Sequence, residues 1–337
     1  MVRRRTTAAT LAAAVLLTVL GCSGGQPSGG GTASSGSAGV AAPSRTGSAS
    51  SSGPQQHRIG DTLAEIQLPG HPVYLVTGFG SLWVSVGQDT GGLLVRIDPA
   101  TDKIITSIPI GSDPAGVVVA AGSIWVASYD DGTLTRVDPA KNAVLATIPV
   151  GSGPWEVAVD AGMIWVRNSD ATLTRVDPVA GRRVQVVEVG EAHGQVNAGY
   201  GSVWTVVKDG LARLDSATGR RLATVPIPGC CRGDMLVTPD LVWAADPEHS
   251  TIHAVDPATN RVVRQVSTTE AGGLALTHGA LWVTHGDSGL VTWHSPQDGR
   301  TLGSAQLRGW IAELLVTDDS VWVSGPGAST LSRLATR

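Results

Sequence analysis

Tryptophan recurs along most of this sequence at a nearly constant interval. The repeated positions are Trp83, Trp125, Trp165, Trp204, Trp243, Trp282 and Trp322. The spacings between them are 42, 40, 39, 39, 39 and 40 residues, and each tryptophan sits in a short apolar run. A period of this length is typical of the blades of a β-propeller, and no helical periodicity competes with it.

One period illustrates the blade that the sequence predicts. Turn-forming residues such as Ala121-Gly122 and Asp138-Pro139 divide the second period into short apolar or alternating runs, and proline cannot continue a hydrogen-bonded strand. The four strands expected from these runs are 115–120, 123–128, 133–138 and 143–150. The Asp-Pro pairs are therefore interpreted as turn formers rather than as catalytic aspartates.

The two ends of the repeat region predict how the ring closes. The chain ends just after a third-type strand at 330–334, so the seventh blade lacks its fourth strand. A fourth-type strand without a blade of its own stands at 62–68. Pairing these two segments would complete the last blade and remove its exposed edge. We therefore expect an all-β fold, a seven-bladed β-propeller of four-stranded blades over 60–337.

The residues before the propeller are predicted to be an export signal and a tether. Three arginines, Arg3 to Arg5, precede an apolar run at 11–20, and Val19-Leu20-Gly21-Cys22 resembles a bacterial lipobox. This indicates a signal peptide at 1–21 and lipidation of Cys22, although an ordinary signal peptide with an incidental cysteine would look similar. The export route, Sec or Tat, stays open.

The segment 22–59 is rich in glycine, serine, alanine and proline, so it is predicted to be a disordered tether with a reach of roughly 30 Å. The protein is then expected on the extracytoplasmic side of the cell membrane, anchored through its N-terminal lipid. With the three leader arginines removed, 21 basic residues stand against 28 acidic ones. This acidic balance argues against nucleic acid as a partner, and we expect a monomer that binds an unknown protein or small molecule.

Counting back from each repeat tryptophan identifies a candidate ligand site. Strand alternation should send the residue nine positions earlier to the same side of every blade, at one mouth of the central channel. These residues are Tyr74, Gly116, Glu156, Gln195, Asp234, Gly273 and Glu313. The three carboxylates would suit a divalent cation such as Mg²⁺ or Ca²⁺, or a cationic or polyhydroxyl ligand. The alternative is a solvated polar lining, with carboxylates too far apart to share one metal.

Further candidates are expected on the same face. His193 and Arg232 interrupt a position that holds proline in three blades, and His193 or His285 could serve as acid, base or ligand. Trp155 and Trp310 stand outside the repeat position and are candidates for stacking on a ligand. The loops after the second strands add Arg167, Asn168, Asp246, His249 and Asp287.

An adjacent cysteine pair, Cys230-Cys231, enters the fifth blade. Outside the cytoplasm such a pair can form a vicinal disulfide that stiffens the loop, bind a soft metal or stay as two free thiols. Vicinal disulfides also occur in quinoprotein dehydrogenases, which are longer propellers, so a quinone-linked redox protein is a weaker alternative.

The repeat GSIWVASYDDGTLTRVDPAKNAVLATIPVGSGP resembles the YVTN/NHL-like propeller repeats of exported bacterial proteins, and it is similar to those of streptogramin B (virginiamycin B) lyases. The resemblance covers about 60–337. It implies a propeller and, as one alternative, a metal-dependent lyase that opens a cyclic depsipeptide by elimination with a histidine base. The lyases carry a "WFTE"-like strand, whereas the sixth repeat here reads Trp282-Val283-Thr284-His285.

Motifs for several enzyme classes are absent from the sequence. It contains no phosphate-binding loop, no Gly-x-Ser-x-Gly elbow and no His-Glu-x-x-His pattern, so nucleotide hydrolysis, serine hydrolysis and zincin chemistry have no support. A polar channel mouth without a complete catalytic constellation favours a non-enzymatic binding or scaffolding module at the cell envelope. The lyase and the quinone-linked protein remain the alternatives.

Overall fold

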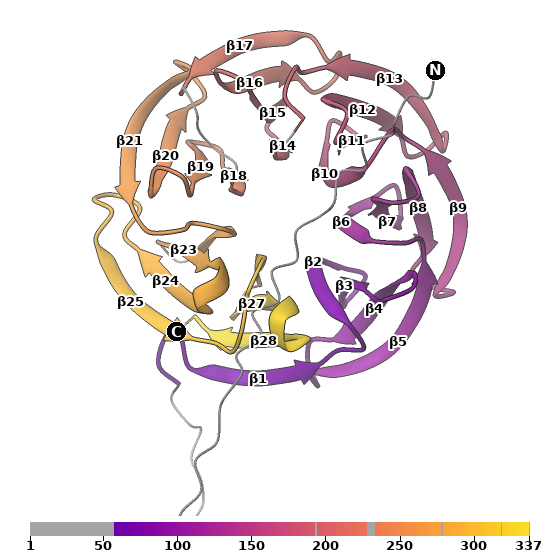
Figure 1. Cartoon of the computed structure of the whole chain (residues 1–337), viewed down its shortest axis with the longest axis horizontal. Helices are drawn as coiled ribbons and strands as arrows, with labels where there is room; N and C mark the ends of the chain where they lie inside the picture. Colours follow the sequence, from indigo (N-terminus) through magenta and orange to yellow (C-terminus); the bar gives the residue numbers. More distant parts are fainter. Residues whose placement is uncertain (1–56, 193, 228–232, 278, 318, 337) are drawn as a thin grey trace, which may run out of the picture. The chain divides into compact units, whose positions relative to one another are not determined.

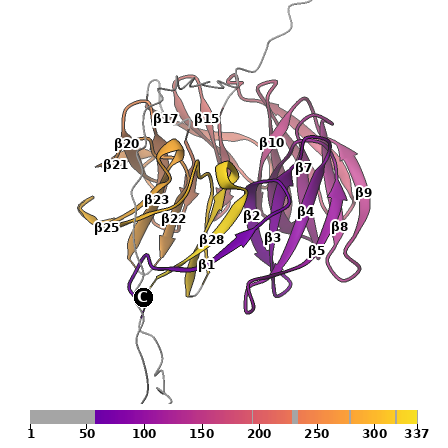
Figure 2. The same cartoon turned by 60° about the horizontal axis from the view of Figure 1, so that its bottom comes forward.

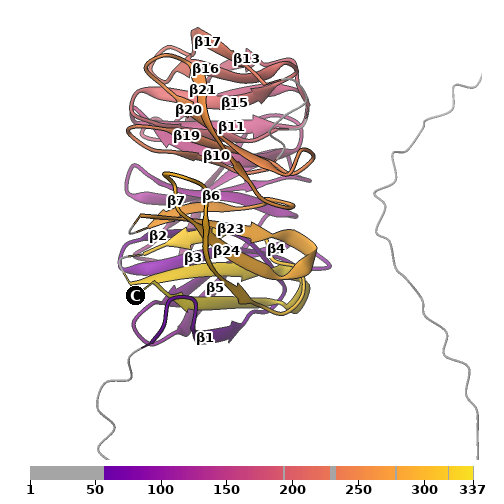
Figure 3. The ribbon, with the colours of Figure 1, turned by 90° about the vertical axis from the view of Figure 1, so that its left-hand side faces the viewer.

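The structure is a computed structural model, and it describes residues 57–192, 194–227, 233–277, 279–317 and 319–336. Seven antiparallel four-stranded sheets follow one another around a central axis (Figure 1). The chain is therefore the seven-bladed propeller that the tryptophan period predicts. The side view in Figure 3 shows β10, β6 and β2, the inner strands of three consecutive blades, in succession around the ring.

Each blade runs outward from the channel, strand by strand. The inner strands, one per blade in chain order, are β2 (His71–Gly78), β6 (Pro114–Ala120), β10 (Pro154–Asp160), β14 (Val196–Gly199), β18 (Met235–Val237), β22 (Leu274–Thr277) and β26 (Leu314–Val316). The second strands are β3 (Ser81–Gly87), β7 (Ser123–Ser128), β11 (Met163–Asn168), β15 (Ser202–Val207), β19 (Val242–Asp246), β23 (Ala280–His285) and β27 (Ser320–Gly325).

The third and fourth strands complete the blades. The third strands are β4 (Gly92–Asp98), β8 (Thr133–Asp138), β12 (Thr172–Asp177), β16 (Gly210–Asp215), β20 (Thr251–Asp256), β24 (Leu290–His294) and β28 (Thr330–Ala335). The outer strands are β5 (Lys103–Ile110), β9 (Ala143–Pro149), β13 (Arg182–Glu188), β17 (Arg221–Pro226), β21 (Arg261–Ser267), β25 (Thr301–Gln306) and, for blade seven, β1 (Thr62–Gln67).

The ring closes as the ends of the repeat region predict. β1 pairs antiparallel with β28, from Thr62 opposite Leu334 to Gln67 opposite Thr330, and Figure 2 shows the two strands side by side. The Gly60 N–H also donates to the Ala335 carbonyl at 2.9 Å. The first strand of the fold thus supplies the outer edge of the last blade.

Helical structure is confined to two short 3-10 turns, η1 (Gly286–Ser288) and η2 (Pro326–Ala328), among the described residues. Neither they nor any other helix in that part of the chain is long and apolar enough to cross a membrane.

The repeat tryptophans form the core at the seams between blades. All seven side chains are 0–1% exposed. Each seam cluster joins the tryptophan of one blade to apolar side chains of the next: Trp83 packs with Val117 and Val126, and Trp204 packs with Met235 and Val242. Because burial of a tryptophan removes roughly 150–250 Å² from water, these seams account for the demand for this residue type.

An arginine on the third strand covers the tryptophan in five blades. In blade one, Arg96 lies opposite Trp83 across the β3–β4 pair, with its guanidinium carbon 4.9 Å from the ring centroid. Its nitrogens donate to the Ser81 hydroxyl at 2.9 Å and, in the next blade, to the Pro139 carbonyl at 2.8 Å and the Asn142 side chain at 2.9 Å. The arginine therefore joins two blades by hydrogen bonds, with a cation–π contact on its inner side.

Blades five and six depart from this arrangement. In blade five the arginine position is Ala254, and Arg264 on the neighbouring outer strand donates instead to the Pro296 carbonyl of blade six. In blade six the position is Trp293, which stacks on Trp282 with ring centroids 4.6 Å apart. Blade five thus keeps a hydrogen bond to the next blade, whereas in blade six a second aromatic ring covers the repeat tryptophan.

Candidate functional site at the mouth of the channel

The residues nine positions before the repeat tryptophans gather around one cavity. Tyr74, Glu156, Asp234 and Glu313, from blades one, three, five and seven, line a cavity of about 220 Å³. Tyr74 and Glu156 lie in the first half of β2 and β10, and Asp234 and Glu313 directly precede β18 and β26, so all four stand toward the end where the chain enters each blade. Glycines occupy the same position in blades two and six, so the side chains of the other blades have room over the channel axis.

Glu156 is the most enclosed of the three carboxyl groups, with 7% of its surface exposed. With the Gln195 amide oriented by its hydrogen-bond network, that nitrogen donates to both carboxylate oxygens, at 2.5 and 3.0 Å. The Val196 N–H also donates to the carboxylate, and the Tyr74 hydroxyl lies within hydrogen-bonding reach. Burial, reinforced by the negative charge of Asp234, nevertheless raises the pKa of Glu156 to about 8.

Asp234 connects two blades through its carboxylate. One oxygen accepts the Met235 N–H at 2.7 Å, and the other accepts the Leu274 N–H of blade six at 2.9 Å. Burial raises the pKa of Asp234 to about 7, although both N–H groups favour the charged form. Asp234 therefore has a structural partner in the neighbouring blade as well as a place on the cavity wall.

Glu313 and Tyr74 complete the acidic wall. Burial raises the pKa of Glu313 well above its usual range, and the charges of Asp234 and Glu156 act in the same direction. Burial also raises the pKa of Tyr74, assisted by Glu156, Glu313 and Asp234. Because these groups oppose one another's ionisation, the ring holds protons near neutral pH, and a bound cation would displace them.

The carboxylates are not grouped closely enough for direct coordination of one metal ion. Within the described ranges, no three histidine, cysteine, aspartate or glutamate side chains are placed to hold a metal. The cavity therefore offers negative charge from several separated walls rather than a compact ligand set.

His285 occupies a different environment from the one expected for a base at the mouth. Its side chain is 3% exposed, and both ring nitrogens have partners: Nδ1 lies 2.5 Å from the Thr269 carbonyl and Nε2 lies 2.7 Å from the Thr292 hydroxyl. The same hydroxyl lies 2.8 Å from Nε2 of His294. Burial lowers the pKa of both histidines, so this buried network favours neutral imidazoles.

The two tryptophans expected to stack on a ligand lie in different surroundings. Trp155 is partly buried against the core between blades two and three, whereas Trp310 is 44% exposed beside the turn at Gly327, on the face of the carboxylates. Five predicted residues lie outside the described part of the chain: Cys22, His193, Cys230, Cys231 and Arg232.

Several loop residues expected on the open face are buried. Arg167 is 0% exposed, and Nη2 donates to the Glu191 carbonyl, while Nε and Nη1 have no hydrogen-bond partner among the described residues. Burial lowers the pKa of Arg167 to about 10. Asp246 is 2% exposed, and its carboxylate faces Nδ1 of His249 at 2.9–3.0 Å and Nε2 of His253 at 3.3 Å.

The sequence predicted neither that Arg167 is buried nor that His253 faces Asp246. A signal for Arg167 was available, because the position two residues after the repeat tryptophan holds serine, threonine, alanine or valine in the other blades. No comparable signal marks His253, which meets Asp246 only through the pairing of β19 with β20.

Comparisons with known proteins agree with the fold. The propeller is similar to the solved structure titled Kuenenia stuttgartiensis hydrazine synthase, with a TM-score of 0.71 and 13% identity over 83% of this chain and 99% of that chain. It is also similar to the computationally designed Ika8 protein, with a TM-score of 0.60 and 13% identity over 80% of this chain and 98% of that chain. No family model and no curated protein matches the sequence. At these identities the likeness shows the propeller fold alone.

Proposed function

We propose that this protein is a binding module of the cell envelope, anchored through a lipid on Cys22, whose channel mouth binds a positively charged ligand. The observation that carries the proposal is the cavity walled by Glu156, Asp234 and Glu313. Three blades place a carboxyl group at one position, and the described residues that line the cavity include no basic side chain. Binding a cation there would satisfy charges that burial otherwise disfavours.

The spacing of the carboxyl groups favours one kind of cation. An extended organic ammonium compound can reach several walls at once, whereas a single Mg²⁺ or Ca²⁺ would have to keep much of its water shell to span them. The YVTN/NHL-like repeat suits such a binding role, since these propellers are exported bacterial proteins. The lyase alternative loses support at His285, because both imidazole nitrogens already have partners.

The test is calorimetric titration of the purified full-length protein with spermidine, Mg²⁺ and Ca²⁺ in two buffers of different ionisation enthalpy. We expect saturable spermidine binding with release of protons, because the carboxyl groups must ionise to hold the ligand. The triple variant Glu156→Gln, Asp234→Asn, Glu313→Gln should lose both binding and proton release. A charge-matched control, Glu65→Gln, Glu188→Gln, Asp209→Asn, changes only exposed side chains and should bind as the wild type does.

Two results would contradict the assignment. Binding that persists in the triple channel variant would place the ligand elsewhere, and no heat with any of the three cations would leave the ring as channel lining. Anchoring is tested separately by mass spectrometry of the N-terminal peptide and by Cys22→Ala, which should release the protein from the membrane fraction.

A further inference from the structure

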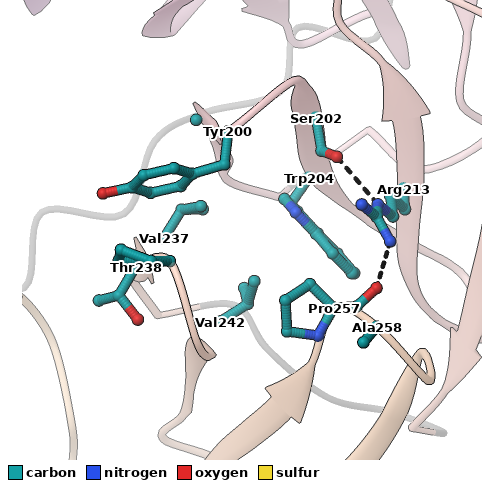
Figure 4. A pocket seen from close by; sticks show the side chains of 11 residues that line it. Tyr200, Ser202, Trp204, Arg213, Val237, Thr238, Val242, Pro257 and Ala258 are labelled. Carbon is teal, nitrogen blue, oxygen red and sulfur yellow. Dashed lines mark hydrogen bonds between the residues drawn. The ribbon is translucent and has the colours of Figure 1, made fainter.

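A second cavity lies between blades four and five, at the opposite end of the strands from the carboxylates. It has a volume of about 180 Å³, and its walls include Tyr200, Trp204, Arg213, Val237, Val242 and Pro257. Figure 4 shows the Tyr200 ring on one side, with Trp204 and Pro257 across the cavity and Arg213 beyond Trp204. The turn that carries Tyr200 joins an inner strand to a second strand, so this cavity opens on the other face of the ring.

We propose that this cavity binds a small aromatic carboxylate. The site is independent of the cation site proposed for the channel. Its walls combine aromatic, aliphatic and proline side chains, which favour a planar apolar ring, with the polar side chains of Ser202, Thr238 and Arg213. A cavity of about 150 Å³ accommodates benzene in a protein core, so the volume here leaves room for a ring with a small polar group.

The cavity exists because this seam is wider than the corresponding seam between blades one and two. At Gly199 an added Cβ would stand 3.4 Å from the Val237 side chain, whereas at the equivalent Gly78 it would stand 2.7 Å from the Val119 side chain. The position of Val242 is also occupied by a larger residue, Ile124, at that seam. One methylene group and a closer approach of the blades therefore fill the space there.

The charge of Arg213 supplies the preference for an anion. Its Nε donates to the Ser202 hydroxyl at 2.9 Å and its Nη1 to the Pro257 carbonyl and, at 3.3 Å, to the Asn260 side chain. These partners are neutral, and Nη2 has no partner among the described residues. The guanidinium is thus held in place beside the cavity with one nitrogen available for a carboxylate.

The equivalent arginine of blade seven is neutralised by two carboxylates. Arg333 is paired with Asp102 at 3.2 Å and with Asp319 at 3.1 Å. At the seam between blades four and five the corresponding positions are Asn260 and Gly201. Both carboxylates that neutralise Arg333 are therefore missing around Arg213, and a ligand carboxylate would take their place.

Tyr200 adds an observation that core packing does not explain. Its backbone has a φ of 53°, a conformation that is unfavourable for a bulky side chain, and its ring is 66% exposed. Phe79 occupies the same turn in blade one, with a φ of 54°, and alanines, Ala121 and Ala161, occupy it in blades two and three. Of the two aromatic residues, Tyr200 lines the cavity, so its ring is the one placed to contact a ligand there.

The experiment is equilibrium dialysis of the full-length protein against radiolabelled benzoate, with benzyl alcohol as the uncharged competitor. We expect one benzoate per chain with a Kd of about 1 mM, a value typical of so small a ligand, and little competition by benzyl alcohol. The channel triple variant should bind benzoate unchanged, which separates this site from the channel.

Two variants that preserve the fold test the charge and the space. Asn260→Asp replaces the side-chain amide next to Arg213 by a carboxylate of the same shape. Arg213 would then be paired as Arg333 is with Asp102, so benzoate affinity should fall at least tenfold. Val242→Ile fills the cavity with the residue found at the equivalent position of blade two, and should also abolish binding. Asn142→Asp makes the same isosteric change at Arg96, away from the cavity, and should have no effect.

A third variant tests the aromatic wall. Tyr200→Gly should abolish binding without lowering the Tm, because glycine adopts this φ freely, whereas Phe79→Gly in the equivalent turn of blade one should leave binding intact. Unchanged affinity in Asn260→Asp and Val242→Ile, equal loss in Asn142→Asp, or no benzoate bound up to 20-fold above the expected Kd, on the order of 20 mM, would each overturn the proposal.

Discussion

The seams between blades and the mouth of the channel use the same repeat in opposite ways. At the seams the residue type is nearly constant: tryptophan in all seven blades, covered by arginine in five. Nine residues earlier, the blades carry tyrosine, two glycines, glutamine and three carboxylates. The constant position faces another blade and holds the ring together, whereas the variable position faces a shared cavity. Variation within a repeat thus marks where this molecule can recognise something.

The largest effect is expected at a seam. Trp125→Ala should lower the free energy of unfolding by about 3–5 kcal/mol, because a fully buried aromatic side chain is lost and a cavity remains. Urea denaturation followed by far-UV circular dichroism measures this change. The control is Trp310→Ala, which removes a 44% exposed ring and should cost less than about 1 kcal/mol. Equal losses would mean that the seams do not dominate stability.

The channel should make stability fall as the pH rises. Glu156 has a usual pKa of 4.5 and a pKa of about 8 in the fold, so its contribution is complete below 4.5 and is lost as the pH rises through about 8. Asp234, with a pKa of about 7, acts in the same direction. Urea denaturation at pH 6 and pH 9 should therefore show a difference on the order of a few kcal/mol, which Glu156→Gln with Asp234→Asn should reduce.

The buried histidines of blade six act with the opposite sign and serve as an internal control. The pKa values of His285 and His294 are lowered from 6.5, so their contribution is present above pH 6.5 and is lost as the pH falls through the lowered values. The channel variant should leave this acid-side decline unchanged. A variant that removed the acid-side decline and kept the alkaline one would contradict the assignment of the two effects.

The smallest effect is expected for the arginines that donate hydrogen bonds to the next blade. Arg96→Ala removes a cation–π contact and three hydrogen bonds, and should cost about 2 kcal/mol. Arg264→Ala removes one hydrogen bond to the next blade and should cost less than about 1 kcal/mol. Comparison of the two midpoints of urea denaturation checks this order. A larger loss at Arg264 would show that blade five depends more on its substitute arginine than the contacts indicate.

Much of the fold and part of the site followed from local pattern. The tryptophan period predicted seven blades, and the surplus strand at the N-terminal end predicted the β1–β28 closure. Counting back from each tryptophan led to Tyr74, Glu156, Asp234 and Glu313, which the structure brings to one cavity. This worked because the distance from the tryptophan to the channel is spanned by one short hairpin in every blade, and side chains alternate strictly along it.

The same counting does not reach contacts between residues of different blades or different strands. His285 was expected at the open mouth, but the backbone carbonyl of Thr269 and the hydroxyl of Thr292 enclose it. The arginines of the third strands recur at equivalent positions in five repeats of the sequence. Their role became visible only when the proline carbonyl of the next blade was seen beside them.

By itself the sequence determined the number of blades, the strand that closes the ring and the side of each hairpin that faces the channel, because these depend on periods of two and of about 40 residues. Only the tertiary structure decided which charges are buried together, that Arg333 is paired with two carboxylates whereas Arg213 is not, and that a cavity opens between blades four and five. Those properties depend on contacts between side chains of different blades and different strands. One methylene group, or a difference of less than 1 Å in the distance from the inner strand to the next blade, is enough to open or fill the space. Gly78 and Gly199 show this difference.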